Sequence, residues 1–551
     1  MRSAKSHLLQ AAVFLLIAAI LVALAVRPAS TQAPPPQTSM HDYSEMVYSP
    51  ILSETNDNVS GTMLDMQENG LDYVNYWVQT SVAITALREN GAVDGIREVL
   101  ESLMGTFQRN GCFPRPVYRD FEYGWVSSMD APAIAVLAQL MYEETGEDRY
   151  RDFVASLSEY MTKDVSEHGY IAQIHGQPWL FEYADTNTTA ETGEFVLNGS
   201  LLGTLCTAMV ARVTGNSELW ALVEKQTALY EEMMPQYWYA EDAWCYYMLQ
   251  PKTVDPPHYV IFEIRLFNAL AEATGIDFYG QEAQRRIDLL KSNYRLNVFE
   301  QDDGTLQYLF FRGGAPHYYY TDIYDTELVF LDAQDNILQC DRMGDRTIET
   351  AWMSGAYPAD TARVEWNVVP NVAWSVEMGA LEINFLEPSQ AEIPSPLAVT
   401  YDASADGCME AEDRFVIQAE RSEESRCNLI GTLSAAQPLA ATTIYAMELD
   451  NLSEETFSAN IVLYDMAGNA ISRYLPEILP GKNLELFTLP GFVDYGNGEM
   501  QDLSSFILRL YTSDDTKESE ITIGNFYQLK NTWQLQQLLT EGEYSINYGN
   551  G

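Results

Sequence analysis

Residues 195–233, with the sequence FVLNGSLLGTLCTAMVARVTGNSELWALVEKQTALYEEM, decide the fold of the first half of this chain. Two runs with apolar residues at three- and four-residue spacing, 195–213 and 217–233, are separated by Thr214-Gly215. A glycine at this point suits the left-handed cap that ends many helices. The stretch therefore predicts two consecutive helices joined by a short turn, a unit that we call a helical hairpin.

The same pattern recurs three more times before about residue 295. Helical runs stop at Asn90-Gly91, Thr145-Gly146 and Thr274-Gly275, and a second amphipathic run follows each stop. The paired runs are 76–87 and 93–107, 132–142 and 149–161, and 261–273 and 279–294. Four hairpins at a spacing of roughly 55 to 70 residues predict an (α/α) toroid or barrel, complete or partial.

The connections between the hairpins are long and aromatic, at 110–125, 164–192 and 237–259. In a toroid such connections gather at one end of the barrel, where they would line a cleft. A single aromatic side chain there is better explained as a plug of the barrel mouth. The whole set, with Glu182 among it, favours a cleft that binds sugars, because rings stack on sugar faces and weak acids move protons.

From about residue 296 apolar and polar residues alternate between Gly, Asp and Asn turns, which is typical of strands. The segments 332–338 and 465–471 share one hairpin-turn pattern. We therefore predict a multidomain α + β protein, an (α/α) toroid or barrel followed by two β-sandwich modules that bind carbohydrate or act as spacers. The predicted domains are a leader at 1–39, the barrel at 40–295, a β-sandwich at 296–395 and a jelly-roll-like β-sandwich at 396–551.

The leader begins with basic residues and continues with an unbroken apolar run, 11–26. This pattern predicts an export signal, either a cleaved signal peptide or a signal-anchor that stays in the membrane, followed by a Pro-rich spacer. The basic residues keep the N-terminus inside the cell. The rest of the chain is therefore expected outside the cytoplasm, either extracellular or at the cell surface.

The chain has 79 acidic and 31 basic residues, which gives a net charge of -48. This balance argues against nucleic acid as a partner, because phosphate binding needs a basic face. The six histidines show no HExxH spacing, which argues against a histidine-bound zinc ion. Of the six cysteines, Cys408 and Cys427 are candidates for a disulfide outside the cell, and the sequence leaves that pairing open.

Five short blocks in a fixed order carry a resemblance to a known family: Gly124-Trp125, Glu182-Tyr183, 195–199, Tyr246-Tyr247 and His258-Tyr259. They resemble the C-terminal catalytic domain of the D-glucuronyl C5-epimerases that act on heparosan-type polysaccharides. The resemblance covers roughly residues 65–295. It implies an isomerase on an (α/α) barrel that inverts C5 of glucuronate residues within an acidic polysaccharide substrate.

The resemblance also implies roles for single residues. The chain departs from the family at Gln250, where the family has an arginine, and β-modules follow the barrel where the animal enzymes have a β-domain before it. His258 competes with Tyr259 for one family position. The implied roles are a proton-moving carboxylate at Glu182, tyrosines at Tyr183, Tyr247 and Tyr259, and an asparagine at Asn198.

The chemistry of C5 inversion gives these residue types a purpose. The reaction needs a base on one ring face, an acid on the other, and neutralisation of the developing enolate. No cofactor is expected to be required and no metal ligand is assigned, and a divalent cation such as calcium is left open. The expected roles are Glu182 and Tyr247 as opposed acid and base, Tyr183 and Tyr259 as support, Arg115 and Arg119 as ligands of the uronate carboxylate, and Trp125, Asn198 and His258 as residues that position the sugar.

Two other functions remain open from the sequence. A polysaccharide lyase or glycoside hydrolase on the same scaffold would use the same cleft, although a hydrolase needs two opposed carboxylates. A non-catalytic polysaccharide-binding protein is favoured by the Gln250 departure. The oligomeric state is also left open.

Overall fold

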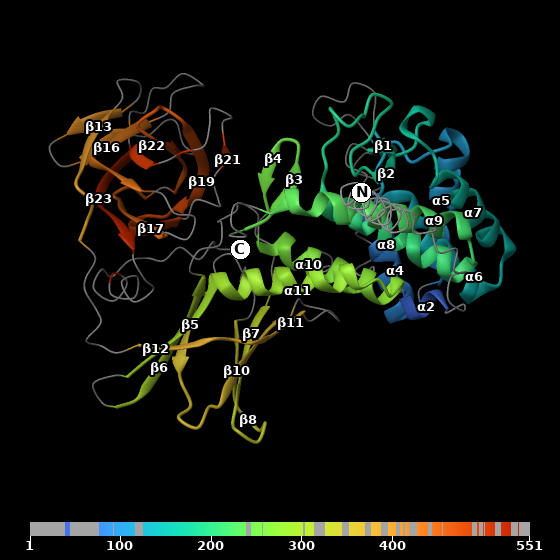
Figure 1. Ribbon diagram of the computed structural model, residues 1–551, viewed down its shortest axis with the longest axis horizontal. Coiled ribbons are helices and arrows are strands. Elements are labelled where there is room, and N and C mark those ends of the chain that lie inside the picture. Colours follow the sequence, from blue (N-terminus) through green and yellow to red (C-terminus); the bar gives the residue numbers. More distant parts are fainter. Residues whose placement is uncertain are drawn as a thin grey trace, which may run out of the picture.

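The computed structural model (Figure 1) describes part of the chain. The leader's apolar run at 11–26 and Arg119 lie outside the described residues. The described ranges are 39–43, 76–91, 93–115, 125–238, 244–255, 257–300, 304–312, 325–343, 352–369, 376–386, 395–403, 408–411, 414–417, 427–438, 444–454, 456–487, 493–494, 502–512 and 519–529, with residues 500 and 538.

Four helical hairpins make up the first half of the described chain, which confirms the glycine-punctuated pattern. The first helix of each hairpin stops at a glycine with φ between 59° and 70°, a left-handed conformation that glycine adopts without strain. The pairs are α4 (Tyr76–Asn90) with α5 (Val93–Asn110), α6 (Asp130–Thr145) with α7 (Asp148–Tyr160), α8 (Leu197–Thr214) with α9 (Ser217–Met233), and α10 (Pro257–Thr274) with α11 (Asp277–Asn293). The shorter helices are α2 (Met40–Tyr43), η4 (Val165–Glu167) and η5 (Met234–Tyr237).

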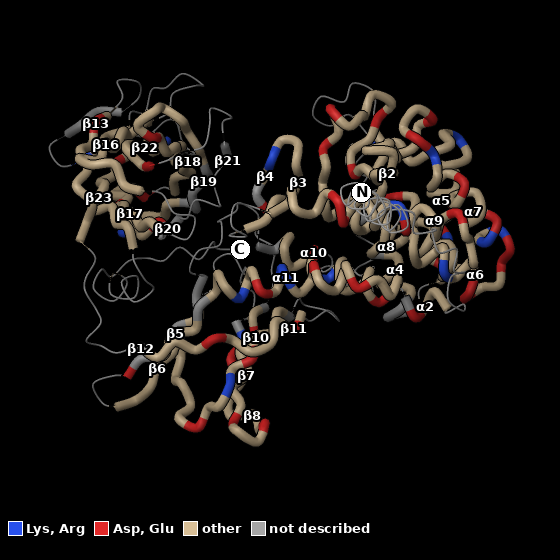
Figure 2. The backbone as a smooth tube through the Cα atoms, viewed as in Figure 1, with Lys and Arg blue, Asp and Glu red and all other residues tan. Residues whose placement is uncertain are grey.

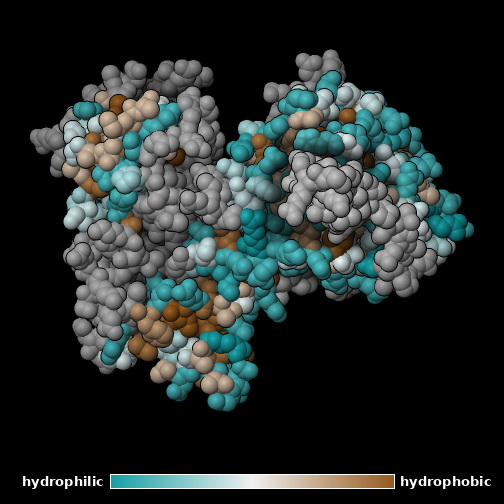
Figure 3. All heavy atoms as spheres, in the orientation of Figure 1, coloured by the Kyte–Doolittle hydropathy of each residue, from teal (hydrophilic) through white to brown (hydrophobic). Residues whose placement is uncertain are grey.

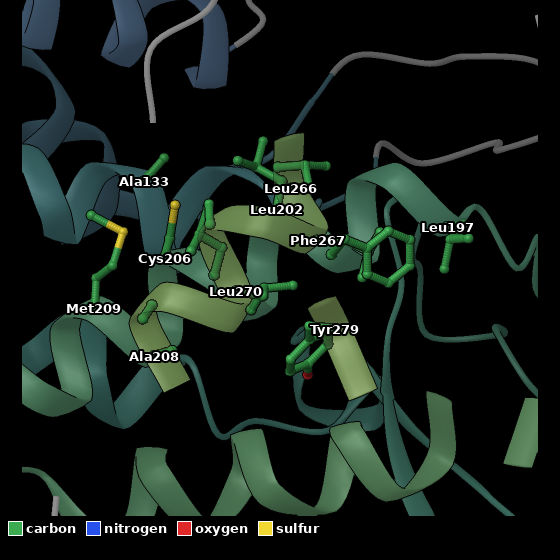
Figure 4. Close-up of a cluster of buried hydrophobic side chains, with 14 of the residues drawn as sticks. Ala133, Leu197, Leu202, Cys206, Ala208, Met209, Leu266, Phe267, Leu270 and Tyr279 are labelled. Carbon is green, nitrogen blue, oxygen red and sulfur yellow. The ribbon is translucent and has the colours of Figure 1, made fainter. Parts of the chain in front are cut away.

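The first helices of the hairpins, α4, α6, α8 and α10, lie side by side in that order. They are interior helices, and in α8 every residue from Leu197 to Ala211 is buried, which is the burial expected of a helix that is apolar on all sides. Figure 4 shows part of this core, where Leu202 of α8 packs with Leu266 and Leu270 of α10. The amphipathic second helices cover the outer side.

Two small β-hairpins stand on this helical layer. The strands β1 (Ile171–Ile174) and β2 (Gln177–Leu180) precede α8, and β3 (Tyr246–Leu249) and β4 (Lys252–Val254) precede α10. Both pairs are antiparallel. They belong to the long aromatic connections, and they carry several of the expected site residues.

Two four-stranded sheets follow the helices, and their core is continuous with the helical core. Trp366 packs against Tyr294 and Phe310, with ring centroids 4.8 and 5.3 Å apart, within the buried cluster that also contains the helical side chains. The buried core therefore continues across residue 295, where the sequence predicts a domain boundary, and that boundary stays a prediction. One sheet has the order β12-β5-β6-β9 and the other β11-β10-β7-β8, with β5 (Tyr294–Glu300), β6 (Leu306–Arg312), β7 (Asp325–Leu331), β8 (Ile337–Met343), β9 (Trp352–Ala356), β10 (Arg363–Val369), β11 (Val376–Ala380) and β12 (Ile383–Leu386).

The C-terminal part contains a six-stranded and a five-stranded sheet around a second buried cluster, in which Phe506 and Phe526 pack 5.2 Å apart. Cys427 is disulfide-bonded, whereas Cys112, Cys206, Cys245 and Cys340 are free. The sheets have the orders β13-β16-β22-β18-β19-β21 and β14-β15-β23-β17-β20, with β13 (Val399–Ala403), β14 (Cys408–Ala411), β15 (Arg414–Ile417), β16 (Cys427–Pro438), β17 (Ile444–Asn451), β18 (Phe457–Tyr464), β19 (Ala470–Ile478), β20 (Gly481–Phe487), β21 (Val493–Asp494), β22 (Asp502–Thr512) and β23 (Ser519–Leu529).

The hairpin turn predicted to occur twice has the same hydrogen bonds in both copies. Asp332 N–H donates to the Asn336 carbonyl at 3.0 Å, and the Asn336 amide donates to Asp332 Oδ2 at 2.9 Å. The corresponding distances for Asp465 and Asn469 are 3.1 and 2.7 Å. An Asp that binds the backbone ahead of it closes the turn locally, which is why the sequence pattern was sufficient.

Asp and Glu outnumber Lys and Arg in the sequences of α5, α7 and α9, and Figure 2 marks these positions along the backbone. Hydrophobic residues gather over the β5–β12 sheets (Figure 3), where Ile337 and Phe385 are exposed by 67% and 63%. Among the helices that the structure describes, none combines the length and the apolar character needed to span a membrane.

Candidate active site

Backbone pairing brings the first two aromatic connections together. Arg115 and Trp125 form an antiparallel bridge, and Val126 pairs with Ala184 in another, at 2.9 and 3.0 Å. Ser128 N–H also donates to the carbonyl of Phe181 at 3.0 Å. Glu182 and its neighbours are thus held against the start of α6.

Glu182 is buried against the first turn of α8. A Cβ atom at Gly199 would lie 2.2 Å from Glu182 Oε2, so glycine is required for the carboxyl group to occupy this position. Asn198 precedes this glycine and is buried as well. The Val-Leu-Asn-Gly block therefore supplies the space that Glu182 fills.

The β3–β4 hairpin delivers Tyr247 to the same place. Met248 pairs with Val196, directly before α8, in an isolated bridge. Tyr247 stacks on Tyr259, in the first turn of α10, with ring centroids 5.2 Å apart and planes inclined by 20°. Tyr247 thus comes from the β3–β4 hairpin and Tyr259 from the first turn of α10. Both phenols lie near the Glu182 carboxyl group at the start of α8.

Tyr183 lies close to both Glu182 and Tyr247, and its side chain contributes to the pKa shift of each. Burial raises the pKa of Glu182 to about 7, and the Tyr183 hydrogen bond and the Arg115 charge offset part of that rise. Burial also raises the pKa of Tyr247, and the charges of Glu182, Tyr183 and Tyr259 raise it further. The site therefore joins a carboxyl group that titrates near neutral pH to a phenol that stays protonated.

Arg115 is buried beside the site and is engaged by a partner. Its Nε donates to Asp130 Oδ2 at 2.7 Å and its Nη2 to Asp130 Oδ1 at 2.5 Å. Its guanidinium also lies 4.6 Å from the Trp125 ring, which in turn packs 4.9 Å from the Tyr183 ring. Arg115 is therefore a fixed positive charge behind the tyrosines, and a direct contact with a substrate carboxylate remains a prediction.

Of the other expected residues, His258 lies in the first turn of α10, and its side chain is not described. Two further carboxylates act on Arg115 or on Glu182 in the structure. Asp130 is the first residue of α6 and holds Arg115, and the charge of Glu194 helps to raise the Glu182 pKa. The sequence signal for Asp130 was its place at a helix start, where carboxylates are favoured, but nothing local pointed to Arg115.

Comparison with known proteins agrees with these blocks. Residues 104–288 match the family model described as the D-glucuronyl C5-epimerase C-terminus. The predicted resemblance is confirmed. The match indicates a C5-epimerase-like function, an isomerase acting on carbohydrate, for this helical region, which we call the C5-epimerase-like region. No curated protein is significantly similar in sequence to the whole chain.

Solved structures resemble the chain only weakly. The chain covers 24% of PfGH50B, with 12% identity, a TM-score of 0.20 and 25% of its own length aligned. It covers 88% of a family 105 glycoside hydrolase of C. acetobutylicum ATCC 824, with 12% identity, a TM-score of 0.31 and 56% of its own length aligned. It covers 96% of a carbohydrate-binding module of the β-sandwich superfamily, with 10% identity, a TM-score of 0.18 and 43% aligned.

Proposed function

We propose that the chain is an exported uronyl C5-epimerase that inverts C5 of glucuronate residues in a polysaccharide by two-sided proton transfer. The observation that carries this proposal is the close group of Glu182, Tyr183 and Tyr247, with Tyr259 stacked on Tyr247. Glu182 exchanges a proton near neutral pH, and Tyr247 keeps its proton. Those are the two states that a proton-transfer pair needs.

The directions of the pKa shifts support one assignment of the two roles that the sequence left open. Glu182, ionised in part near pH 7, accepts the C5 proton as its C–H bond breaks and an enolate forms. The protonated phenol of Tyr247 then donates its proton to the opposite face of C5. The reverse reaction exchanges the two roles, so the enzyme needs no cofactor in this proposal, and a divalent cation such as calcium stays open.

Each turnover leaves a protonated Glu182 and a tyrosinate at Tyr247. Tyr183 lies close to both side chains, so its hydroxyl group is proposed to take the proton from Glu182 while it passes its own to Tyr247. Two protons each move one step, and no net charge leaves the site. Tyr183 would therefore restore the starting protonation state, and the exchangeable protons of these groups equilibrate with solvent between turnovers.

The surrounding residues complete the proposal. Trp125, Asn198 and His258 position the sugar, and Arg119 holds the uronate carboxylate, with Arg115 fixed by Asp130 as a positive charge behind it. The row α4, α6, α8 and α10 is proposed to be a segment of an (α/α) toroid, and the β-sandwiches to be carbohydrate-binding or spacer modules. The apolar leader is proposed to place the enzyme at the cell surface, anchored or secreted.

The test is incubation of the full chain with glucuronate polymers in heavy water. Two-sided transfer incorporates deuterium at C5 and leaves the polymer length unchanged. A lyase would instead create an unsaturated end that absorbs in the ultraviolet, and a hydrolase would shorten the polymer. Binding without exchange for glucuronate and related polymers would replace this proposal with the binding-protein function.

A further inference from the structure

A second buried group of ionisable side chains lies beneath the β3–β4 hairpin, apart from Glu182. Its members come from α10, α11 and the two residues that flank the β3–β4 hairpin, and they are almost completely inaccessible to solvent. They are Cys245, Asp255, Glu263, Glu282 and Arg286, of which Cys245, Asp255, Glu263 and Arg286 have no exposed surface. Nothing in the proposed proton transfer uses them.

Two arginines serve this group, and neither makes a contact with Asp255 that the structure records. Arg286 Nε donates to Glu263 Oε2 at 2.7 Å and its Nη1 to Glu282 Oε2 at 2.8 Å. The Arg286 guanidinium also lies 4.4 Å from the Phe267 ring. Arg285 lies 3.8 Å from Glu282. Arg286 therefore binds both Glu263 and Glu282, and Arg285 lies against Glu282.

Asp255 has only a weak side-chain partner. The Cys245 thiol donates to Asp255 Oδ2 at 3.7 Å, and within the described residues Asp255 Oδ1 has no hydrogen-bond partner. Glu263 Oε1 is also buried without a partner in the part of the chain that the structure describes. An ionised Asp255 would be a buried charge next to a second carboxylate, which is far more costly than a neutral acid.

The backbone of Asp255 holds the hairpin closed. Asp255 N–H donates to the Cys245 carbonyl at 3.0 Å, and Trp244 Nε1–H donates to the Asp255 carbonyl at 2.6 Å. β3 starts directly after Cys245, and α10 starts two residues after Asp255. Asp255 thus joins the strand pair that carries Tyr247 to the helix that carries Tyr259.

We propose that Asp255 is a neutral carboxylic acid that acts as a positioning residue, fixing Tyr247 against Tyr259 by closing the base of the β3–β4 hairpin. The positioning role rests on the proposed epimerase function, whereas the neutral acid and the closed hairpin do not. Proton loss from Asp255 places a second negative charge beside Glu263 and weakens the closure.

The sign of the pH effect follows from the groups that face Asp255. These are Cys245 directly before β3, Glu263 on α10 and Arg286 on α11. Burial and the Glu263 charge raise the pKa of Asp255 well above its ordinary 3.8, and Arg286 offsets part of the rise. The stability contributed by the neutral acid is complete below that ordinary value. It is lost as the pH rises towards the folded-state pKa, because the unfolded chain releases the proton first.

The first experiment compares thermal unfolding of the full chain and of Asp255→Asn from about pH 5 to about pH 9. The asparagine keeps the shape and cannot ionise, so its melting temperature should gain on that of the wild type as the pH rises, by ~2 °C or more. Asp288→Asn, the same change at an exposed position on α11, should run parallel to the wild type. Parallel plots of melting temperature against pH for Asp255→Asn and the wild type would overturn the proposal that Asp255 is a neutral acid.

The second experiment tests the closure through Trp244. Trp244→Phe removes the N–H that binds the Asp255 carbonyl and keeps an aromatic ring, and it should raise amide hydrogen exchange of residues 246–254 on the order of 10-fold. The matched control is Trp220→Phe on α9, whose N–H binds Glu224 at 3.2 Å. Unchanged hairpin exchange in Trp244→Phe would overturn the closure.

The positioning role has its own readout. Trp244→Phe should lower kcat for C5 exchange on the order of 10-fold at unchanged KM, because the tyrosines lose their placement while sugar contacts remain. An equal fall of kcat in Trp244→Phe and Trp220→Phe would show that the loss comes from general destabilisation. If the wild type exchanges no C5 proton, the proposed function fails, while the melting and amide-exchange results still decide the neutral acid and the closure.

Discussion

Gly199 and Glu182 share one small volume at the start of α8: a Cβ atom on residue 199 would lie 2.2 Å from Glu182 Oε2 and 2.7 Å from its Cδ. The position of the Glu182 carboxyl group thus depends on residue 199 being a glycine, which has no side chain. The relationship also explains why an Asn-Gly pair at a helix start accompanies a Glu-Tyr pair in an earlier connection.

Gly199→Ala is expected to displace the Glu182 carboxyl group. Overpacking of a buried site costs about 1–3 kcal/mol of unfolding free energy, and C5 exchange should fall on the order of 10²-fold because the proton acceptor has moved. Urea unfolding and exchange rates measure the two effects. Gly95→Ala is the control, since Gly95 lies within α5 with no atom within 4 Å of the added Cβ among the described residues. Equal behaviour of the two variants would refute the contact.

The pKa of Glu182 sets the pH dependence of exchange. With that pKa raised to about 7 by burial, the rate should increase between about pH 6 and pH 8 as the carboxylate form appears. Stability contributed by the protonated form is complete below the ordinary pKa of 4.5 and is lost as the pH rises from there to about 7. The measurement is kcat/KM against pH. A rate that is already constant from pH 5 would contradict the assignment of Glu182 as base.

The Arg115–Asp130 pair is predicted to act on stability and on the Glu182 pKa. Removing one partner of a buried ion pair costs roughly 3–5 kcal/mol, so Asp130→Asn should unfold at clearly lower urea concentration. Arg115→Met removes a charge that lowers the Glu182 pKa, so the rate profile should move to higher pH. Arg363→Met, at an exposed pair with Glu365, should leave both properties unchanged. An unshifted profile in Arg115→Met would exclude the electrostatic role.

Tyr183→Phe should separate the first turnover from later ones. The variant keeps the ring against Trp125 but removes the hydroxyl group between Glu182 and Tyr247. A single turnover should proceed at close to the rate of the wild type, while steady-state exchange should fall on the order of 10-fold because the proton no longer returns. Rapid-quench kinetics distinguish the phases, and equal losses in both would show that Tyr183 has no part in the return.

The elements that sequence reasoning predicted are those set by local physics. The glycine stops at Gly146 and Gly215 end helices through a backbone conformation of one residue, and the turn at Asp332 closes through contacts within five residues. The family blocks placed Glu182 and Tyr247 in one site.

The electrostatic environment could not be predicted in the same way. Arg115 and Asp130 meet because the bridge from Arg115 to Trp125 folds the connection back onto α6, and Asp255 meets Glu263 through packing of the hairpin on α10. Both depend on tertiary placement of residues with no distinctive spacing. Arg115 was expected to face the substrate because the sequence shows its charge. The sequence does not show that the Asp130 carboxylate binds this charge.

The most direct test of the central claim is the rate of deuterium incorporation at C5 of a glucuronate polymer by the wild type, Glu182→Gln, Tyr247→Phe and Tyr279→Phe. Tyr279, on α11, is buried and bonded to Thr227 at 2.6 Å, which makes it a matched control for loss of a phenol. The account predicts losses on the order of 10²-fold or more in Glu182→Gln and Tyr247→Phe, and none in Tyr279→Phe. Unchanged incorporation in both Glu182→Gln and Tyr247→Phe would contradict it.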